Sequence, residues 1–359
     1  MALPAKEQSD ASLFQNQSST MPTFRDHFGA SYSKTPISVF WNMGVHLLHD
    51  PDYEHAQICP SQPTQDRVLN ERQYQVIVLP YAYHRAKLGY NSTMDNKTAH
   101  TLVKLNNAFY THVHDSFSQT RQSPWNGWKR LAEEIPTHFW NRTLISLLDL
   151  ACGNGRFEQF LAHSYPETIF DAKCIDSCDE LFDTSALPQK TLLQLSFHHW
   201  DILNDIDEIP SNLPTVDLSA CFGFFHHIPL QEWRERVLAY LASQTRPDGY
   251  IAISFWSFMN DPSFAQKANR THQQALQWFT QNKNSLSLDQ QIDVTQLQAN
   301  DFFLGWQHAD GVYRYCHSYT SEEIDELLAT LPPSVSVVSR YFADGKNNNL
   351  NEYVILHVE

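Results

Sequence analysis

Long apolar segments are absent from this sequence. No run of about 18 apolar residues occurs anywhere, and a helix needs that length to cross a membrane. Residues 1–20 are polar and lack the apolar stretch that a secretory signal requires. These absences disfavour membrane and secreted proteins, so we expect a cytoplasmic protein that does not contact a membrane.

Cysteine pairs of the metal-binding kind are also missing. The sequence has six cysteines, and no two of them form a Cys-x-x-Cys pair. Cys174 and Cys178 flank Asp176 at a spacing that differs from structural zinc sites. Several cysteines lie in apolar runs, where cysteine behaves as a small hydrophobic residue. We therefore predict reduced, buried thiols and no metal site.

Basic residues are few. The chain carries 25 Lys and Arg against 40 Asp and Glu, a formal net charge of −15. Such a balance disfavours binding to the phosphates of nucleic acids. Residues 66–130 are the exception, with nine basic and four acidic side chains. This asymmetry permits a basic face on an acidic protein.

Three regions differ in composition. Residues 1–24 are rich in Ser, Gln, Thr and Asn, and we predict a disordered tail. Residues 25–105 contain short apolar patches, which predict an ordered accessory segment of unknown role. Residues 106–359 are predicted to form one α/β domain, with a polar, Gln-rich insertion of helical spacing at residues 258–306. An insertion at that point lies near the strand ends where open α/β sheets bind substrates.

Short apolar runs alternate with helical stretches after residue 143, a pattern typical of a doubly wound parallel sheet. Five strands are expected at Leu144–Leu150, Thr168–Ile175, Leu192–His199, Val216–Phe222 and Tyr250–Phe255. Helices are expected at Arg156–His163, Asp179–Ala186 and Leu230–Ser243. The predicted fold class is α/β, with a Rossmann-like, mostly parallel seven-stranded sheet.

The last forty residues are expected to complete this sheet. A helix begins at Thr320, where Glu323 stands at the capping-box position, and it ends before Pro332. Val335–Tyr341 and Tyr353–Val358 are expected to form a closing antiparallel hairpin.

Three successive strand ends carry residues suited to a nucleoside cofactor. The first strand leads into residues 149–155, Asp-Leu-Ala-Cys-Gly-Asn-Gly, whose small side chains let the backbone turn tightly and approach a ligand. Asp176 follows 21 residues after Gly155, at the place of a carboxylate that accepts hydrogen bonds from ribose hydroxyls. Asp201 follows the third strand and can meet the amino group of adenine.

We interpret this set as a site for S-adenosylmethionine (SAM), formed by Asp149, Ala151, Cys152, Gly153, Gly155, Asp176 and Asp201. A nicotinamide dinucleotide fits less well, because Phe157 and Glu158 follow where the Gly-x-Gly-x-x-Gly pattern ends in a third glycine. In a purely structural alternative, the glycines serve a turn and Asp176 caps a helix.

Residues after the fourth and fifth strands are candidates for contact with a substrate. His226 and His227 follow the fourth strand, where an imidazole can hold a substrate oxygen or act as a base. A helix cap or a place in the core is the alternative for this pair. Trp256 follows the fifth strand, and it either forms an aromatic wall against the substrate or packs in the core.

Two arginines lie in aromatic surroundings. Arg121 is close in sequence to Trp125, and Arg314 stands among Tyr313, Tyr315 and Tyr319. A guanidinium group binds carboxylate or phosphate with two parallel hydrogen bonds. A solvated place on the surface is the alternative for each arginine.

The same residues give the chain a resemblance to a known family. Residues 109–121 end in Ser-Gln-Thr-Arg and are followed by Pro124-Trp125. They resemble the entry motif of the tRNA wobble-uridine carboxymethyl methyltransferases, which include the methyltransferase domain of the AlkB-homologue tRNA enzymes. The resemblance continues through the glycine turn, residues 225–227, Trp256 and residues 313–319, and it covers residues 106–359.

The resemblance implies a class I SAM-dependent methyltransferase that esterifies a 5-carboxymethyl group on the wobble uridine of tRNA. It implies that Arg121, His227, Trp256 and Arg314 lie near the modified base as catalytic residues, and that Asp176 holds the cofactor ribose. It also implies a small zinc-binding activator protein as a partner. A carboxylate is already a nucleophile at neutral pH, so positioning and desolvation are the work required of the protein.

Two other functions stay open at this point. An O-methyltransferase that acts on a small-molecule carboxylate or hydroxyl is favoured by the acidic balance of the chain. A non-catalytic scaffold with the same fold is the second alternative, and the intact set of Asp149, Gly153, Gly155 and Asp176 disfavours it.

Overall fold

The computed structural model describes residues 94–121, 123–182, 192–209, 214–307, 309 and 311–359. The tail expected at residues 1–24 lies outside this part, as do most of the accessory segment and residues 183–186 of the second expected helix. No helix among the described residues is both long and apolar enough to cross a bilayer.

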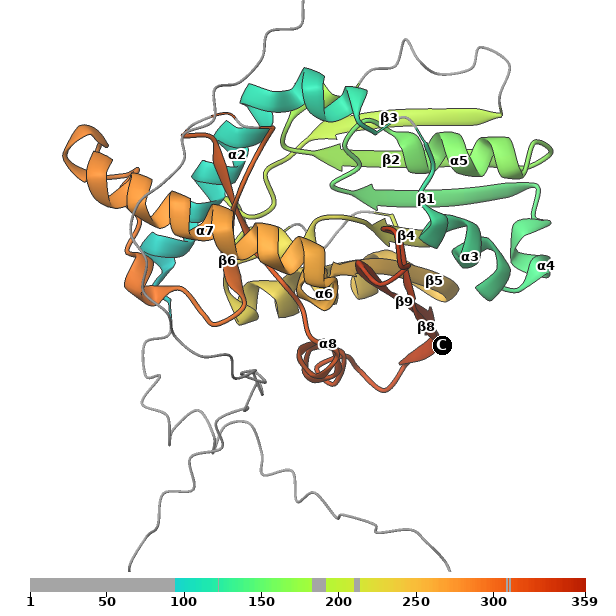
Figure 1. Ribbon diagram of the computed structural model, residues 1–359. Helices are drawn as coiled ribbons and strands as arrows, with labels where there is room; N and C mark the ends of the chain where they lie inside the picture. Colours follow the sequence, from blue (N-terminus) through green and yellow to red (C-terminus); the bar gives the residue numbers. More distant parts are fainter. Residues whose placement is uncertain (1–93, 122, 183–191, 210–213, 308, 310) are drawn as a thin grey trace, which may run out of the picture. The chain divides into compact units, whose positions relative to one another are not determined.

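A seven-stranded sheet forms the centre of the described chain, as predicted (Figure 1). Its strands are β1 (Leu144–Leu150), β2 (Ile169–Asp176), β3 (Leu193–His199), β4 (Val216–Cys221), β5 (Thr245–Trp256), β8 (Val335–Ala343) and β9 (Asn351–Val358). They lie in the order β3-β2-β1-β4-β5-β9-β8, and the neighbours from β3 to β5 are parallel. β9 runs antiparallel to both β5 and β8, which confirms the expected closing hairpin.

The strand order reverses its direction between β1 and β4. The chain builds outward from β1 to β3 and then returns to the other side of β1 with β4. In open α/β sheets, ligands bind in the crevice at the carboxyl ends of the strands next to such a reversal. The residues expected at successive strand ends therefore meet at one edge of the sheet.

Helices cover both faces of the sheet (Figure 1). They are α2 (Asn96–Gln119), α3 (Asn126–Glu134), α4 (Thr137–Trp140), α5 (Arg156–Ser164), α6 (Gln231–Gln244), α7 (Pro262–Asn282) and α8 (Ser321–Leu328). Alternation along β1 shows the two faces: Ile145 and Leu147 pack in a core with residues of α3, α4 and α5. Leu148 and Leu150 pack in a second core with residues of α2, α6, α7 and α8. Because helices cover both faces there, the inner strands β1, β4 and β9 are almost completely buried.

Helix α2 crosses the position where the accessory segment was expected to end. It begins after Asp95, whose side chain accepts a hydrogen bond from the backbone N–H of Thr98, and it continues to Gln119. The expected boundary between residues 105 and 106 therefore falls inside a single helix. The buried face of α2 includes Leu102, Asn106 and Phe109, and this face packs against the strand β7 described next.

The insertion after β5 contains the expected helix and an additional strand. Helix α7 begins at Pro262 behind an Asp261 cap. The segment then returns as β6 (Asp301–Gly305), which pairs antiparallel with β7 (Tyr313–His317) in a separate two-stranded sheet. This pairing, which sequence periodicity did not reveal, fixes the position of Arg314.

Helix α8 confirms the predicted cap. The Thr320 side chain accepts a hydrogen bond from the Glu323 backbone N–H, and the Glu323 side chain accepts one from the Thr320 backbone N–H. The helix ends at Leu328, before the two prolines at residues 332 and 333.

Candidate functional site

A cavity of about 330 Å³ lies at the carboxyl ends of the parallel strands. Residues from the ends of β1, β2, β4 and β5 line it, together with residues of α2 and β7. Ten of the eleven residues proposed from sequence belong to this lining: Arg121, Asp149, Ala151, Cys152, Gly153, Asp176, Asp201, His227, Trp256 and Arg314. The cavity therefore brings the two predicted groups of residues together in one space.

The turn after β1 has the conformation that its glycines favour. Ala151, Gly153 and Gly155 all have a positive φ, at 62°, 55° and 67°. A Cβ atom on Gly153 would meet nothing within 4 Å, so its backbone faces open space. Gly155 instead stands at the N-terminus of α5 beside Phe182, and it is the one proposed residue that does not line the cavity.

Asp176 joins the end of β2 to this turn. One carboxylate oxygen accepts from the backbone N–H of Gly153 at 2.8 Å, and the other accepts from that of Cys178 at 3.0 Å. Burial raises the pKa of Asp176, and the backbone N–H groups of Cys178 and Gly153 oppose this shift. Each oxygen retains a lone pair, so the carboxylate can also accept from two ligand hydroxyls.

Asp201 lies two residues after the end of β3 and lines the same cavity. Its carboxylate accepts from the Asn107 side-chain amide at 2.6 Å and from the Asn204 backbone N–H at 3.1 Å. Asn107 belongs to α2, so this helix positions an acidic group in the lining of the cavity.

Asp149 forms a buried pair with Glu158 of α5. Burial raises the pKa of Asp149 well above its usual range, and the neighbouring Glu158 raises it further. One oxygen of each carboxyl group is buried without a hydrogen-bond partner. Burial also raises the pKa of Glu158, so this environment disfavours the ionisation of both carboxyl groups together.

Arg314 is the most unusual charged group in the cavity. Only 7% of the residue is exposed, and no described carboxylate lies within ion-pair distance of its guanidinium. One terminal nitrogen, Nη1, donates to the Tyr110 hydroxyl at 2.7 Å, and the buried Nε has no partner. The guanidinium lies beside the rings of Phe109, Tyr110 and Trp256, at 5.2, 5.9 and 5.5 Å. These rings, rather than the adjacent tyrosines expected from sequence, surround it.

Arg121 adds a second positive charge to the same side. Its guanidinium stacks on Phe117 at 3.5 Å and lies 5.6 Å from the ring of Trp306, not on the expected Trp125. Burial lowers the pKa of Arg121 to about 10, and the neighbouring charge of Arg314 contributes to the shift. The group stays protonated at neutral pH.

Sequence reasoning did not single out Arg156, a third arginine that lines the cavity. It donates to Asn154 at 3.0 Å and to the backbone carbonyl of Ser123 at 2.9 Å. Burial lowers its pKa to about 10. The position directly after Gly155, at the start of α5, was the available signal for this residue.

The two histidines have different surroundings. His226 packs edge-on against Trp256, with ring centroids 4.8 Å apart, and its Nδ1 is buried without a partner. His227 has both nitrogens engaged, with Nδ1 near the Tyr315 carbonyl at 2.9 Å and Nε2 near the Tyr110 hydroxyl at 2.8 Å. Burial lowers the pKa of both imidazoles, that of His227 to about 3.

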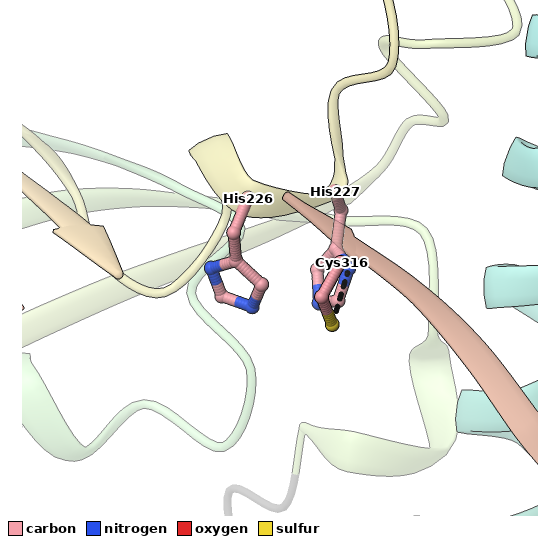
Figure 2. Close-up of side chains that lie close together, drawn as sticks. All are labelled: His226, His227 and Cys316. Atoms are coloured by element: carbon pink, nitrogen blue, oxygen red, sulfur yellow. Dashed lines mark hydrogen bonds between the residues drawn. The ribbon is translucent and has the colours of Figure 1, made fainter. Parts of the chain in front are cut away.

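Figure 2 shows His226 and His227 on one short turn, with Cys316 of β7 beside His227. Their potential ligand atoms all lie within 4.8 Å of one another. Because both nitrogens of His227 are hydrogen-bonded, a metal ion would have to displace one of its partners. The charge of Arg314, which acts on both histidines, also opposes a cation here.

The cysteines of the described residues agree with the expected thiols. Cys152, Cys174, Cys178, Cys221 and Cys316 are buried and form no disulfide. Cys59 lies outside the described residues.

Comparison with known proteins returns structural neighbours only. No family model matches the chain, and no curated protein matches it. A SAM-dependent methyltransferase from Methanosarcina mazei aligns with TM-score 0.42 and 16% identity, over 62% of this chain and 97% of that one. A second, from Clostridium acetobutylicum, aligns with TM-score 0.40 and 13% identity, over 69% and 97%.

A third neighbour is the magnesium protoporphyrin IX methyltransferase of Synechocystis with bound SAM. It aligns with TM-score 0.36 and 11% identity, over 78% of this chain and 92% of that one. Likenesses this distant carry no argument about activity, which has to come from the site itself.

Proposed function

We propose that this protein is a SAM-dependent methyltransferase that transfers the methyl group to a carboxylate. The environment of Arg314 carries this proposal. A guanidinium buried without an acidic partner is costly, because its charge has lost water and gained no compensating anion. The Nε–H of Arg314 is buried and has no partner, and an acceptor carboxylate that reaches it would form one arm of a two-pronged hydrogen bond. An acceptor that brings a carboxylate would supply the missing partner.

The other half of the cavity fits SAM. The positive-φ turn at residues 151–155 gives a ligand close access to the backbone, and Asp176 has acceptor capacity left for ribose hydroxyls. Asp201 lies on the same side and can accept from an adenine amino group. Bound there, SAM would supply a methyl group on a positively charged sulfur.

The remaining work of the protein is positioning. Transfer to a carboxylate neutralises one negative and one positive charge and releases no proton, so no general base is needed. Arg314 and Arg121 would hold the acceptor carboxylate, and the aromatic walls would exclude water, which favours a step that removes charge. His226 lines the cavity beside Trp256 and is suited to a hydrogen bond with a polar edge of the acceptor.

The finer proposal is a 5-carboxymethyl-type uridine at the wobble position of tRNA. The two sequence elements of the family resemblance, residues 118–121 and residues 313–315, supply Arg121 and Arg314 to the same cavity. Trp256 offers a flat apolar surface to a pyrimidine ring, as proteins commonly do for bases splayed from single-stranded RNA. The basic window at residues 66–130 is suited to the RNA backbone.

A small-molecule carboxylic acid is the alternative acceptor. The net charge of −15 favours it, because an acidic protein repels a polyanion over long range. The same arginines would hold either acceptor, so the two proposals differ only in the molecule that carries the carboxylate.

The test is transfer of a labelled methyl group from SAM to bulk tRNA, followed by mild alkali. We expect label that alkali releases, because methyl esters hydrolyse and methylated bases do not. The assay is run with Arg314→Ala and with Arg270→Ala, which changes an exposed arginine on α7. Alkali-stable label would exclude a carboxylate acceptor, and absence of label in tRNA with transfer to small acids would favour the alternative.

The family resemblance also implies a small zinc-binding activator. The same assay is therefore performed with protein purified from its native cells, where such a partner would co-purify. Activity that only the native preparation shows would indicate that a partner is required.

A further inference from the structure

The two proposed catalytic residues His227 and Arg314 are connected through a tyrosine. Tyr110 of α2 places its hydroxyl oxygen 2.8 Å from Nε2 of His227 and 2.7 Å from Nη1 of Arg314. The tyrosine ring also packs edge-on against the imidazole, with centroids 5.4 Å apart. Three segments far apart in sequence therefore meet at one hydroxyl group.

The direction of each hydrogen bond follows from the chemistry of the partners. Two groups lie near Nδ1 of His227: the Tyr315 carbonyl at 2.9 Å, which can only accept, and the Asn106 side-chain nitrogen at 3.1 Å, which can only donate. The Asn106 nitrogen also donates to the Tyr315 carbonyl, so we assign the Nδ1 proton to the shorter contact with that carbonyl. Arg314 can only donate, so the Tyr110 oxygen accepts from Nη1. The Tyr110 proton is then directed at Nε2 of His227, which has the remaining lone pair.

Asn106 holds the backbone that fixes this arrangement. Its side-chain oxygen accepts from the Tyr315 backbone N–H at 2.7 Å, and its amide nitrogen donates to the Tyr315 carbonyl at 3.2 Å. Asn106 lies one turn before the half-buried Tyr110 on the same face of α2. The helix therefore determines the position of both β7 and the tyrosine hydroxyl.

This arrangement leaves His227 without a lone pair directed into the cavity. Its only acceptor nitrogen points at Tyr110, and Tyr110 in turn occupies one donor of Arg314. Arg314 lines the cavity and its buried Nε–H has no hydrogen-bond partner, so an acceptor carboxylate is the partner that we expect for this guanidinium.

We propose that Tyr110 and His227 are positioning residues that hold Arg314 in the orientation that binds the acceptor carboxylate, and that His227 does not receive a proton in the reaction. The proposal rests on the proposed function for its substrate. It assigns a role to Tyr110, which the sequence motif contained but did not single out. It also reverses the expectation that His227 contacts the substrate.

The test compares two substitutions of His227. In His227→Gln, the side-chain oxygen can accept from the Tyr110 hydroxyl in place of Nε2, but an amide cannot act as a base. In His227→Ala, that acceptor is lost. We expect His227→Ala to raise the KM for the acceptor about tenfold, the effect of one hydrogen bond, and His227→Gln to recover most of this loss. Equal, severe loss of kcat in both variants would overturn the proposal in favour of a base.

Tyr110→Phe tests the other side of the connection. It keeps the ring and removes the hydroxyl, so we expect the KM for the acceptor to rise by a similar factor, with SAM affinity unchanged. The double variant with His227→Ala should be no worse than either single one, because both remove the same link. Independent, multiplying losses would show that the two residues do not act through one hydroxyl group.

One measurement separates this proposal from the proposed function. Nitrogen-15 NMR of histidine-labelled protein reports which nitrogen of His227 carries the proton, without any acceptor present, and the His227→Gln spectrum assigns the signal. We expect the proton on Nδ1. A proton on Nε2 would overturn the positioning role whatever the acceptor is, whereas Nδ1 protonation without methyl transfer to any carboxylate would leave this arrangement standing and refute the proposed function.

Discussion

The two halves of the cavity are built in different ways. The half that we propose for the cofactor comes, apart from Asp201, from one stretch of chain, residues 149–176, in which a turn and a carboxylate follow two neighbouring parallel strands. The acceptor half is formed by side chains from α2, the turn at residues 225–227, the end of β5 and β7, which are up to about two hundred residues apart in sequence. One half depends on backbone conformation, and the other depends on how distant elements pack.

This difference predicts how each half responds to substitution. The turn in the proposed cofactor half is held by backbone hydrogen bonds from Ala151 and Cys152 to Ile175 and by the Asp176 side chain, so a single side-chain change removes only a few hydrogen bonds. In the acceptor half, charged side chains are buried with few partners. Loss of one of them leaves an acceptor charge without compensation, and the expected effects are larger.

Arg314→Ala should have the largest effect. It removes the guanidinium that we assign to the acceptor carboxylate, and an unpaired buried charge costs about 2–5 kcal/mol. We expect kcat/KM for the acceptor to fall on the order of 100-fold or more while the dissociation constant for SAM, measured by calorimetry, stays unchanged. Arg314→Lys should recover little, because an ammonium group cannot form the two-pronged contact. A parallel loss of SAM affinity would show that the two halves are not separate.

Asp176→Ala should have the next largest effect, confined to the other half. The variant loses two hydrogen bonds to the ligand ribose, and we expect SAM binding to weaken by about 1.5–3 kcal/mol, the scale for a charged partner. Calorimetry with SAM measures this directly. An unchanged affinity would mean that the ribose site lies elsewhere. Asp205→Ala, which changes an acidic residue outside the cavity lining, is the matched control.

Ala151→Gly should have a smaller effect on the stability of the turn. Ala151 has a φ of 62°, a left-handed conformation that costs an alanine about 1 kcal/mol and costs glycine nearly nothing. Alanine has a suitable size for this turn but an unfavourable backbone preference. We expect the substitution to offset this strain and raise the midpoint of chemical unfolding slightly. A lower midpoint would indicate that the larger conformational entropy of glycine in the unfolded chain outweighs the relief of strain.

How much of the molecule the sequence predicts also follows this division. Strands β1 and β3 and the hairpin of β8 and β9 were predicted to within a few residues, because apolar runs and a change of periodicity are local signals. The association of Asp176 with the glycine turn was predictable too, because parallel strand ends meet at one edge of a sheet.

The surroundings of Arg314 could not be predicted in this way. Its contacts with Phe109, Tyr110 and Trp256 depend on the packing of α2 against β7 and on the pairing of β6 with β7. No periodicity in the sequence specifies either of these. The expected boundary between residues 105 and 106 lies inside α2 for a related reason, because the packing of the buried face of this helix against β7 is not visible in the sequence.

The smallest expected effect is that of pH, and it tests the chemistry of the acceptor half. Burial and Arg314 hold the pKa of His227 at about 3, and burial and His227 hold that of His226 well below its ordinary value of 6.5. At pH 7 and above, both imidazoles are therefore uncharged, and Arg121, with a pKa of about 10, is positively charged. We therefore expect kcat/KM to be flat between about pH 7 and 9.

The stability of the folded protein, by contrast, should depend on pH in the acidic range. The unfolded chain protonates these histidines below about pH 6.5, and the folded chain does not until the pH approaches the depressed folded values. The stability that the neutral, buried imidazoles contribute is therefore complete above 6.5 and is lost as the pH falls. Urea unfolding of the protein and of His227→Gln across this range measures the effect, and the variant should lose less stability on acidification.

A pH profile of kcat/KM that falls near pH 6.5–7 in the native protein, but not in His227→Gln, would instead mean that this imidazole titrates during turnover. The acceptor half would then work by proton transfer.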